Sequence, residues 1–286
     1  MTGPSDEVLS WVESAVKQHV VGSRGLREGG EPWLLRFGDG TAAVLRSGYA
    51  FDTEVAALRL AEARGISAPR LVAVGDGVML QSVVAGTSRV PLTPTSARLA
   101  SLGAAAAELH AVELVPSKDL PLRSRPIERV DFAESRERDG TSTLLREAVD
   151  AVARLPMPLS GPVFVHGDLW QGNTMWVADE LVAVIDWDAA GAGHPGIDVG
   201  SMRCDAAMLF GDGAADVVTT GWQERAGRPP PDLAYWDVVA AVNTPPDLAE
   251  WESVIQDQGR PDLDAATLNT RRDSFLRAAL DRLAGA

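Results

Sequence analysis

Three polar residues interrupt the apolar stretch 163–200, where short runs of Val, Ile, Phe and Trp predict a buried core. They are Asp168, Asn173 and Asp186. Burying a carboxylate or an amide costs free energy unless the group has a partner, so these residue types in such surroundings are typical of sites that carry chemistry. The plain alternative is that the two acids only cap turns.

The strands expected around these residues bring two of them together. Residues 174–178 and 181–185 are short apolar runs separated by two acidic residues, which predicts a tight hairpin. Asn173 lies directly before the first run and Asp186 directly after the second, so their side chains should lie near each other. An amide oxygen and a carboxylate converging beside the loop carboxylate of Asp168 form a hard oxygen site. Such a site suits Mg²⁺ carrying substrate phosphates rather than Zn²⁺.

The spacing of these residues is that of a kinase. In kinases one Asp accepts the hydroxyl proton of the acceptor, and an Asn five residues later and a second Asp hold the metals that bridge the nucleotide phosphates. Asp168 and Asn173 have this spacing, although HGD stands where protein kinases have HRD. Together with IDWD at 185–188 and GAGHPGID at 191–198, the pattern resembles the aminoglycoside phosphotransferase family, which includes choline-kinase-like and other small-molecule kinases. The resemblance covers most of the chain.

The resemblance implies an α+β, bilobal, protein-kinase-like fold. A small antiparallel-sheet N-terminal lobe at 1–85 would bind the nucleotide, and a mostly helical C-terminal lobe at 86–286 would hold the catalytic residues and the acceptor. ATP would be the phosphoryl donor and Mg²⁺ the cofactor. Asp168 would be the catalytic base, and Asn173 and Asp186 would be the metal ligands.

The phosphate side of the nucleotide site departs from the usual kinase pattern. The third expected strand ends in Arg46, where a kinase presents a lysine to the phosphates. Arginine can bind phosphate oxygens through two parallel hydrogen bonds, and Glu54 in the next helix would hold it in place. Gly29 and Gly30 would let backbone N–H groups approach a polyphosphate, although such a pair is usually only a turn. The backbone of Ser82 or Val84 would read the adenine edge.

Three further residues would support the catalytic stretch. We expect His166 to brace the loop rather than take part in the chemistry. Asp188 would either assist the metal ligands or lie at the surface. Asp198 would cap the helix that follows it and tie down the catalytic loop.

The composition bears on the partners. The net charge of −14 argues against nucleic acid and against an anionic membrane. Most of the surplus of carboxylates lies beyond residue 85, where an acidic cleft would attract a cationic acceptor, although acidic surfaces also serve solubility alone. Asp237, Trp236 and Trp251 could pair with amino groups and stack on sugar rings, or be ordinary acids beside core aromatics. No long apolar stretch is present, so we expect a cytoplasmic protein; its oligomeric state leaves no mark on the sequence.

These observations predict an enzyme that moves the γ-phosphoryl group of ATP to a hydroxyl of a small polar molecule. An aminoglycoside or an amino sugar is one such acceptor, and antibiotic resistance would then be its role. The alternative is a catalytically inactive kinase-fold binding protein, because Arg46 replaces the lysine and two acids flank the glycine pair.

The remaining elements follow from periodicity and from Pro and Gly positions. The expected strands are 19–27, 32–37, 41–46, 66–74 and 78–84. The expected helices are 5–19, 52–64, 95–111, 143–155, 199–210, 214–226, 231–242, 246–258 and 264–284, with a loop or short helix at 114–140.

Overall fold

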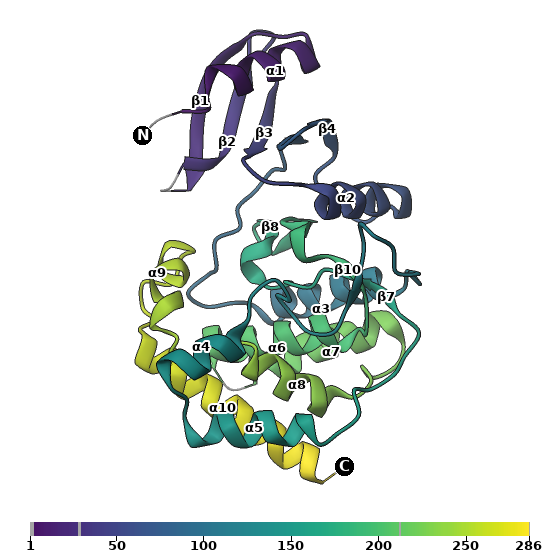
Figure 1. Cartoon of the computed structure of the whole chain (residues 1–286), viewed down its shortest axis with the longest axis vertical. Coiled ribbons are helices and arrows are strands. Elements are labelled where there is room, and N and C mark those ends of the chain that lie inside the picture. Colours follow the sequence, from purple (N-terminus) through teal and green to yellow (C-terminus); the bar gives the residue numbers. More distant parts are fainter. Residues whose placement is uncertain (1–2, 28–29, 212, 286) are drawn as a thin grey trace.

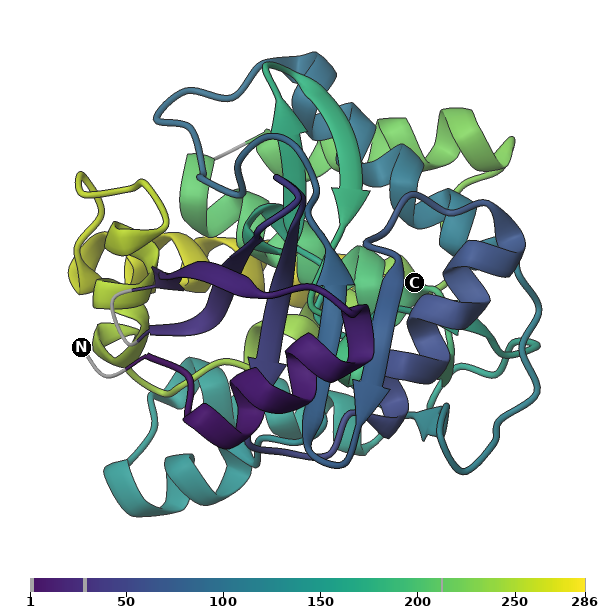
Figure 2. The ribbon, with the colours of Figure 1, turned by 90° about the horizontal axis from the view of Figure 1, so that it is seen from above.

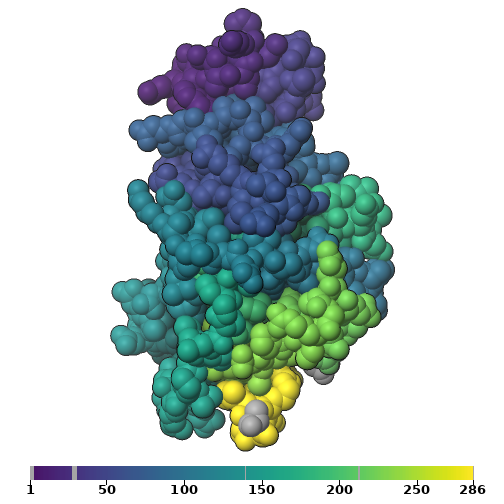
Figure 3. Space-filling view, turned by 90° about the vertical axis from the view of Figure 1, so that its right-hand side faces the viewer, coloured from purple at the N-terminus to yellow at the C-terminus, as the bar shows by residue number. Residues whose placement is uncertain are grey.

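The N-terminal part of the chain is an antiparallel sheet at one end of an elongated molecule (Figures 1 and 3). The computed structural model describes residues 3–27, 30–211 and 213–285. The strands have the order β1-β2-β3-β5-β4, and each neighbouring pair is antiparallel. They are β1 (Val20–Arg27), β2 (Gly30–Phe37), β3 (Ala42–Ser47), β4 (Leu71–Gly75) and β5 (Val78–Ser82).

Helix α1 (Asp6–Val16) covers the outer face of this sheet, as the view from above shows (Figure 2). It begins where the Ser5 side chain accepts the N–H of Val8 at 3.3 Å, and it ends at Lys17, whose φ of 56° is left-handed. Val12 is fully buried against the sheet. The small core between helix and sheet holds Val12, Trp33, Leu35, Phe37, Ala43, Leu45, Val78 and Leu80. This part of the molecule therefore has a hydrophobic core of its own.

The rest of the chain is mostly helical, as predicted. The long helix α3 runs through its centre and packs along α7, while α6 packs against both α7 and α8. The helices are α3 (Ser96–His110), α4 (Phe132–Asp139), α5 (Thr143–Ala153), α6 (Gly196–Phe210), α7 (Ala214–Ala226), α8 (Leu233–Val242), α9 (Ala249–Asp257) and α10 (Ala265–Ala284).

Two small sheets lie between the N-terminal sheet and these helices. One joins β6 (Leu122–Arg123), β10 (Gly191–Gly193) and β7 (Val163–Val165). The other is the predicted hairpin of β8 (Thr174–Val177) and β9 (Glu180–Val184), which is confirmed. The first anchors the loop that begins at His166, and the second holds the residues on either side of the hairpin.

Helix α2 (Asp52–Arg64) precedes β4 in sequence but packs on the helical side of the molecule. Phe51, directly before the helix, and the helix residues Val55 and Leu58 are buried in the same core as Leu102 of α3 and Trp187. Figure 1 shows α2 between the N-terminal sheet and the hairpin. Two hydrophobic cores therefore meet near the end of β3, and the nucleotide residues expected there lie at their boundary.

The segment that leaves β5 pairs with the hairpin. Thr87 and Trp176 of β8 exchange backbone hydrogen bonds of 3.0 and 2.9 Å. Gly86 has φ of 97°, and a Cβ atom there would lie 2.2 Å from the carbonyl oxygen of Trp176. Only glycine allows this close approach, so the linker is attached to the strand that follows Asn173.

Several predicted boundaries differ from the structure. The strand expected at 66–74 begins only at Leu71, two residues after Pro69, which cannot donate to a ladder. The stretch 114–140 contains the short strand β6 and the two-turn helix α4. In the part of the chain that the structure describes, no helix is long and apolar enough to cross a membrane.

Candidate active site

The loop that carries Asp168 is attached to helix α6 through one buried carboxylate. Asp198 Oδ2 accepts the backbone N–H of His166, and Asp198 Oδ1 accepts that of Gly167, both at 2.8 Å. Asp198 lies in the first turn of α6 and makes no cap hydrogen bond there. The expected cap is therefore wrong, because the carboxylate points to the loop instead of to its own helix. The expected contact with the loop is present.

A histidine and a tryptophan hold this carboxylate in turn. Trp222 Nε1–H donates to His110 Nδ1 at 3.0 Å, and His110 Nε2 lies 3.0 Å from Asp198 Oδ2. An indole N–H can only donate, so His110 Nδ1 accepts and Nε2–H donates to Asp198. Burial alone would raise the pKa of Asp198, but the hydrogen bonds and charges of His110 and His166 together outweigh burial and hold the pKa below the usual value. The loop is thus fixed by an ionised, fully buried carboxylate.

His166 is part of the same framework. Its side chain is buried, its Nδ1 accepts the N–H of Asp168 at 3.3 Å, and its Nε2 lies 3.0 Å from the carbonyl oxygen of Ile185. Gly167 has φ of 80°, and a Cβ atom there would lie 2.3 Å from the carbonyl oxygen of Ala189. His166 therefore joins the loop to the end of β9, which is the bracing contact that the sequence suggested.

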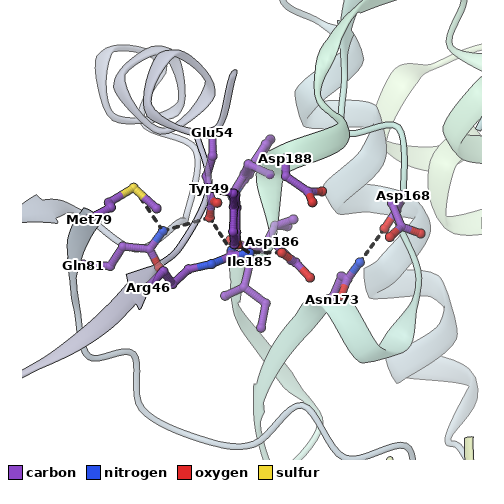
Figure 4. A network of polar contacts seen from close by, with 12 residues as sticks. Arg46, Tyr49, Glu54, Met79, Gln81, Asp168, Asn173, Ile185, Asp186 and Asp188 are labelled. Atoms are coloured by element: carbon purple, nitrogen blue, oxygen red, sulfur yellow. Dashed lines mark hydrogen bonds and ion pairs between the residues drawn. The ribbon is translucent and has the colours of Figure 1, made fainter. Parts of the chain in front are cut away.

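Asp168, Asn173 and Asp186 come together in one place (Figure 4). The Asn173 side-chain N–H donates to the carbonyl oxygen of Asp168 at 2.8 Å, and no described residue donates to the amide oxygen of Asn173. The N–H of Ile185 donates to the carbonyl oxygen of Asn173 at 2.9 Å. This bond places Asp186, the next residue in the chain, close to Asn173. Asp186 has the left-handed φ of 65° and ψ of 62°, which is uncommon for a residue other than glycine and turns its side chain out of the hairpin.

The carboxylates of this site repel one another. Burial raises the pKa of Asp168 well above its usual value, and the charges of Asp186, Asp205 and Asp188 raise it further, while Arg129 lowers it. Burial and the charge of Asp186 also raise the pKa of Asp188. Such a cluster favours a bound cation, because positive charge would offset the repulsion.

A divalent cation fits these residues. Among the residues that the structure describes, no three His, Cys, Asp or Glu side chains form a complete metal site. Mg²⁺ needs fewer protein ligands than that, because it binds through one or two carboxylates and completes its shell with substrate phosphates and water. Asp186 Oδ1 is buried and its close partner is the Arg46 guanidinium at 2.9 Å, and within the described part of the chain nothing donates to the amide oxygen of Asn173. These two side chains can hold Mg²⁺.

Arg46 reaches the same site from the sheet. Its Nη1 lies 2.7 Å from Glu54 Oε1 and 2.9 Å from Asp186 Oδ1, and its Nη2 donates to the hydroxyl of Tyr49. Burial raises the pKa of Glu54 to about 7 despite the charge of Arg46, and Gln81 donates to Glu54 Oε1 at 2.9 Å. The pairing of Arg46 with Glu54 expected from the sequence is present, and it extends to Asp186.

The structure bears differently on the residues predicted to contact the adenine and on the glycine pair predicted to approach the phosphates. The N–H of Ser82 donates to the carbonyl oxygen of Arg70 at 2.8 Å, and the Ser82 hydroxyl accepts from the N–H of Arg70. Ser82 is therefore wrong as an adenine contact through its N–H, because β5 is still paired there. Val84 lies past the end of the strand and keeps this role as a prediction. Gly29 lies outside the described residues, and Gly30 begins β2 opposite Arg27.

Comparisons with known proteins show the family to which this chain belongs. Residues 25–239 match the sequence model of the Phosphotransferase enzyme family, which is most of the chain. The chain belongs to this family. No curated protein sequence matches it.

Solved structures share the fold of this phosphotransferase-family chain. Macrolide 2'-phosphotransferase MphH from Brachybacterium faecium is 18% identical, with 95% of this chain and 98% of that chain covered and a TM-score of 0.62. Spectinomycin phosphotransferase, solved with ADP and spectinomycin, is 12% identical, with 98% of both chains covered and a TM-score of 0.63. Choline kinase from Cryptosporidium parvum is 12% identical, with 92% and 90% covered and a TM-score of 0.59. The predicted bilobal, protein-kinase-like fold is confirmed.

Two of the expected acceptor residues of this phosphotransferase-family chain are buried in its helical part. Asp237 is fully buried and its carboxylate accepts from Arg203 at 2.9 and 3.0 Å and from Arg282 at 2.8 Å. Trp236 is 1% exposed and packs directly on Gly196. The prediction that they contact an acceptor is wrong, because neither is accessible. Trp251 is only partly buried and stays a prediction.

Two residues near Asp168 had not been expected. Arg129, in the segment between β6 and α4, donates to Asp188 Oδ1 at 2.7 Å. Asp205 of α6 is partly buried and makes no hydrogen bond or ion pair with another described residue, and burial raises its pKa to about 7. Arg129 carries no local signal in the sequence. Asp205 could have been found, since it lies seven residues after Asp198 and so on the same face of α6.

Proposed function

We propose that this protein transfers the γ-phosphoryl group of ATP to a hydroxyl group of a small polar acceptor. The observation that carries the proposal is the convergence of Asp168, Asn173 and Asp186 on one site that Arg46 reaches from the sheet. This is the set of groups that phosphoryl transfer requires, since the reaction depends on positioning and on neutralising charge.

Each residue has a defined part in the reaction. The acceptor oxygen attacks the γ-phosphorus while the bond from that phosphorus to the oxygen bridging to the β-phosphate breaks, and ADP leaves. Asp168 orients the hydroxyl and takes its proton, for which a raised pKa makes the carboxylate a better base. Arg46, braced by Glu54, binds the phosphates. Mg²⁺ held by Asn173 and Asp186 would neutralise charge on the phosphates.

The charges on the acceptor side support an amine-bearing acceptor, such as an aminoglycoside or another amino alcohol. Asp168, Asp188 and Asp205 lie on this side and Arg129 is their nearby cation. Asp205 has no hydrogen-bond or ion-pair partner among the described residues, so an ammonium group could pair with it without breaking any contact described there. Neutral hydroxyl compounds of similar size would gain nothing from this carboxylate.

A panel of acceptors with an assay of ADP release tests the proposal. Aminoglycosides, amino sugars, choline and neutral polyols would be compared at equal concentration, with Mg-ATP binding followed by calorimetry. Turnover with an amine-bearing compound, and none with polyols, is the expected result. Binding of Mg-ATP without turnover of any acceptor would favour the inactive kinase-fold protein that Arg46 in place of lysine suggested. No binding at all would reject both nucleotide-dependent functions.

A further inference from the structure

Arg129 contacts two acids of the active site, Asp188 and Asp168, neither of which is ion-paired with Arg46. Its Nη1 donates to Asp188 Oδ1 at 2.7 Å, and its Nη2 lies 3.9 Å from Asp168 Oδ2. The Arg129 side chain is 49% exposed and that of Asp188 is 28% exposed, so the pair is open to solvent. Ion pairs this exposed contribute little net free energy, and exchanging one partner for another costs little.

The segment that carries Arg129 is tied to the catalytic loop and to the helical part. The N–H of Ile127 donates to the carbonyl oxygen of Gly167, next to Asp168, at 2.8 Å. The Arg125 side chain, from the same segment, donates to the carbonyl oxygen of Val130 at 2.8 Å and to Asn243 Oδ1 at 2.7 Å. The position of Arg129 relative to Asp168 is therefore fixed by the backbone on both sides of it.

This arrangement includes a strained residue. Ile127 has φ of 44°, a left-handed conformation that a β-branched side chain rarely adopts. Such a conformation persists only where the surrounding contacts hold it, and it is typical of segments that position a functional group. Arg129 lies two residues after Ile127. The strained backbone of Ile127 is thus located at the turn that directs the Arg129 side chain toward the active site.

The catalytic loop itself offers no positive charge to the group being transferred. Between Asp168 and Asn173 it contains only Leu, Trp, Gln and Gly. Arg46 approaches from the sheet and contacts Asp186, on the nucleotide side. A phosphoryl group passing to an oxygen that is hydrogen-bonded to Asp168 can come within reach of the Arg129 side chain, since its Nη2 lies 3.9 Å from that carboxylate.

We propose that Arg129 binds the phosphoryl group during its transfer, exchanging Asp188 and Asp168 for phosphate oxygens. The inference rests on the proposed phosphotransfer. The planar guanidinium can bind two phosphate oxygens at once, and an arginine supplied to the transferred group is a large contributor in other phosphoryl-transfer enzymes. Arg46 beside Asp186 then binds the triphosphate, and Arg129 beside Asp168 binds the departing phosphoryl group.

The test compares two nucleotides that differ by the terminal phosphate. Calorimetry would measure the binding of MgADP and of the magnesium complex of adenylyl imidodiphosphate to the full chain and to its Arg129→Gln and Arg129→Lys variants. We expect Arg129→Gln to lower the affinity for the imidodiphosphate by about 10- to 100-fold, because a charge-assisted contact to one phosphate is lost. The affinity for MgADP should fall by less than about 2-fold. Arg129→Lys should recover part of the difference.

Arg154→Gln is the matched control, because Arg154 forms an exposed pair with Asp150 on α5 and lies outside the catalytic segment. It should bind both nucleotides as the unchanged protein does. Equal affinity of Arg129→Gln and the unchanged protein for the imidodiphosphate would overturn the role of Arg129 while leaving the phosphotransferase proposal intact. Equal weakening for both nucleotides would also overturn it, since a general structural role would do this. An unchanged protein that binds neither nucleotide would reject both proposals.

Discussion

Arg46 Nη1 lies 2.9 Å from Asp186 Oδ1, so a side chain of the N-terminal sheet is ion-paired with a residue at the end of the hairpin. The same nitrogen lies 2.7 Å from Glu54 Oε1. Arg46 therefore stands where a triphosphate and its cation would meet, with a carboxylate on each side of it. Its replacement of the usual lysine is compatible with phosphate binding, because its charge and its position are both retained.

Removing the charge of Arg46 should weaken nucleotide binding. Arg46→Gln is expected to lower the affinity for MgADP and for Mg-ATP alike by about 10- to 100-fold, since its contacts are to phosphates common to both. Arg46→Lys should lower the nucleotide affinity less than Arg46→Gln does, because the positive charge is kept. Calorimetry measures the effect, and Arg36→Gln on the neighbouring strand is the control, because that side chain is exposed. Full affinity of Arg46→Gln would contradict the assignment.

The role of Asp168 can be separated from nucleotide binding. Asp168→Asn keeps the shape of the side chain and the backbone contact from Asn173, but it cannot accept a proton. We expect kcat to fall by about 10²- to 10⁴-fold with the affinity for Mg-ATP within about 3-fold of the original. Asp150→Asn, on the exposed surface of α5, should change neither quantity. Transfer at the original rate would exclude Asp168 as the base.

Asp198 should make stability depend on pH at the acid end. Its folded-state pKa lies below the usual 3.8, so its contribution is fully present above about pH 4 and is lost as pH falls through the folded-state pKa. Asp198→Asn should lower the free energy of unfolding by about 3 kcal/mol at pH 7. The backbone N–H groups and His110 would then no longer donate to a buried, negatively charged carboxylate.

Urea unfolding at pH 7 and at pH 3 measures this dependence. The difference between Asp198→Asn and the original protein should shrink at the lower pH, where the carboxylate of the original begins to be protonated. The exposed Asp119→Asn serves as the control. A difference that is the same at both values of pH would show that the charge of Asp198 has no part in holding the loop.

Gly167 should tolerate no side chain. Gly167→Ala adds a Cβ atom 2.3 Å from the carbonyl oxygen of Ala189, in a left-handed conformation. Gly40→Ala is the matched control, because Gly40 has φ of 86° but no atom within 4 Å of the added Cβ. Gly40→Ala should cost about 1 kcal/mol of stability and no activity, whereas Gly167→Ala should cost more and abolish phosphoryl transfer. Similar losses in thermal unfolding and activity for both variants would argue against the steric explanation.

The sequence predicts the centre of the site well because that part is local. Asp168, Asn173 and Asp186 lie on one loop and one hairpin, so their spacing alone nearly determines their relative positions. Arg46 and Glu54 lie eight residues apart, on a strand and the helix after it, and their pairing follows from the same local logic.

Contacts between distant segments account for what the sequence does not predict. Asp237 is neutralised by Arg203 and Arg282, which come from two other helices, so nothing near it in sequence indicates that it is buried. Arg129 reaches Asp188 across 59 residues from a segment without periodicity. Ser82 fails because it is the last residue of β5 and its N–H is already bonded to the carbonyl oxygen of Arg70, a contact that the local sequence does not indicate.

The placement of α2 affects how the two ends of the molecule can move. Glu54 is carried by the large helical core, whereas Arg46 is carried by a sheet with its own small core. Gln81 of the same sheet donates to Glu54 Oε1 at 2.9 Å, so Glu54 is held by the sheet as well as by the helices, whereas Asp186 belongs to the end of the hairpin. A rigid-body tilt of the sheet would therefore change mainly the distance from Arg46 to Asp186, so this ion pair reports the degree of closure between the sheet and the hairpin.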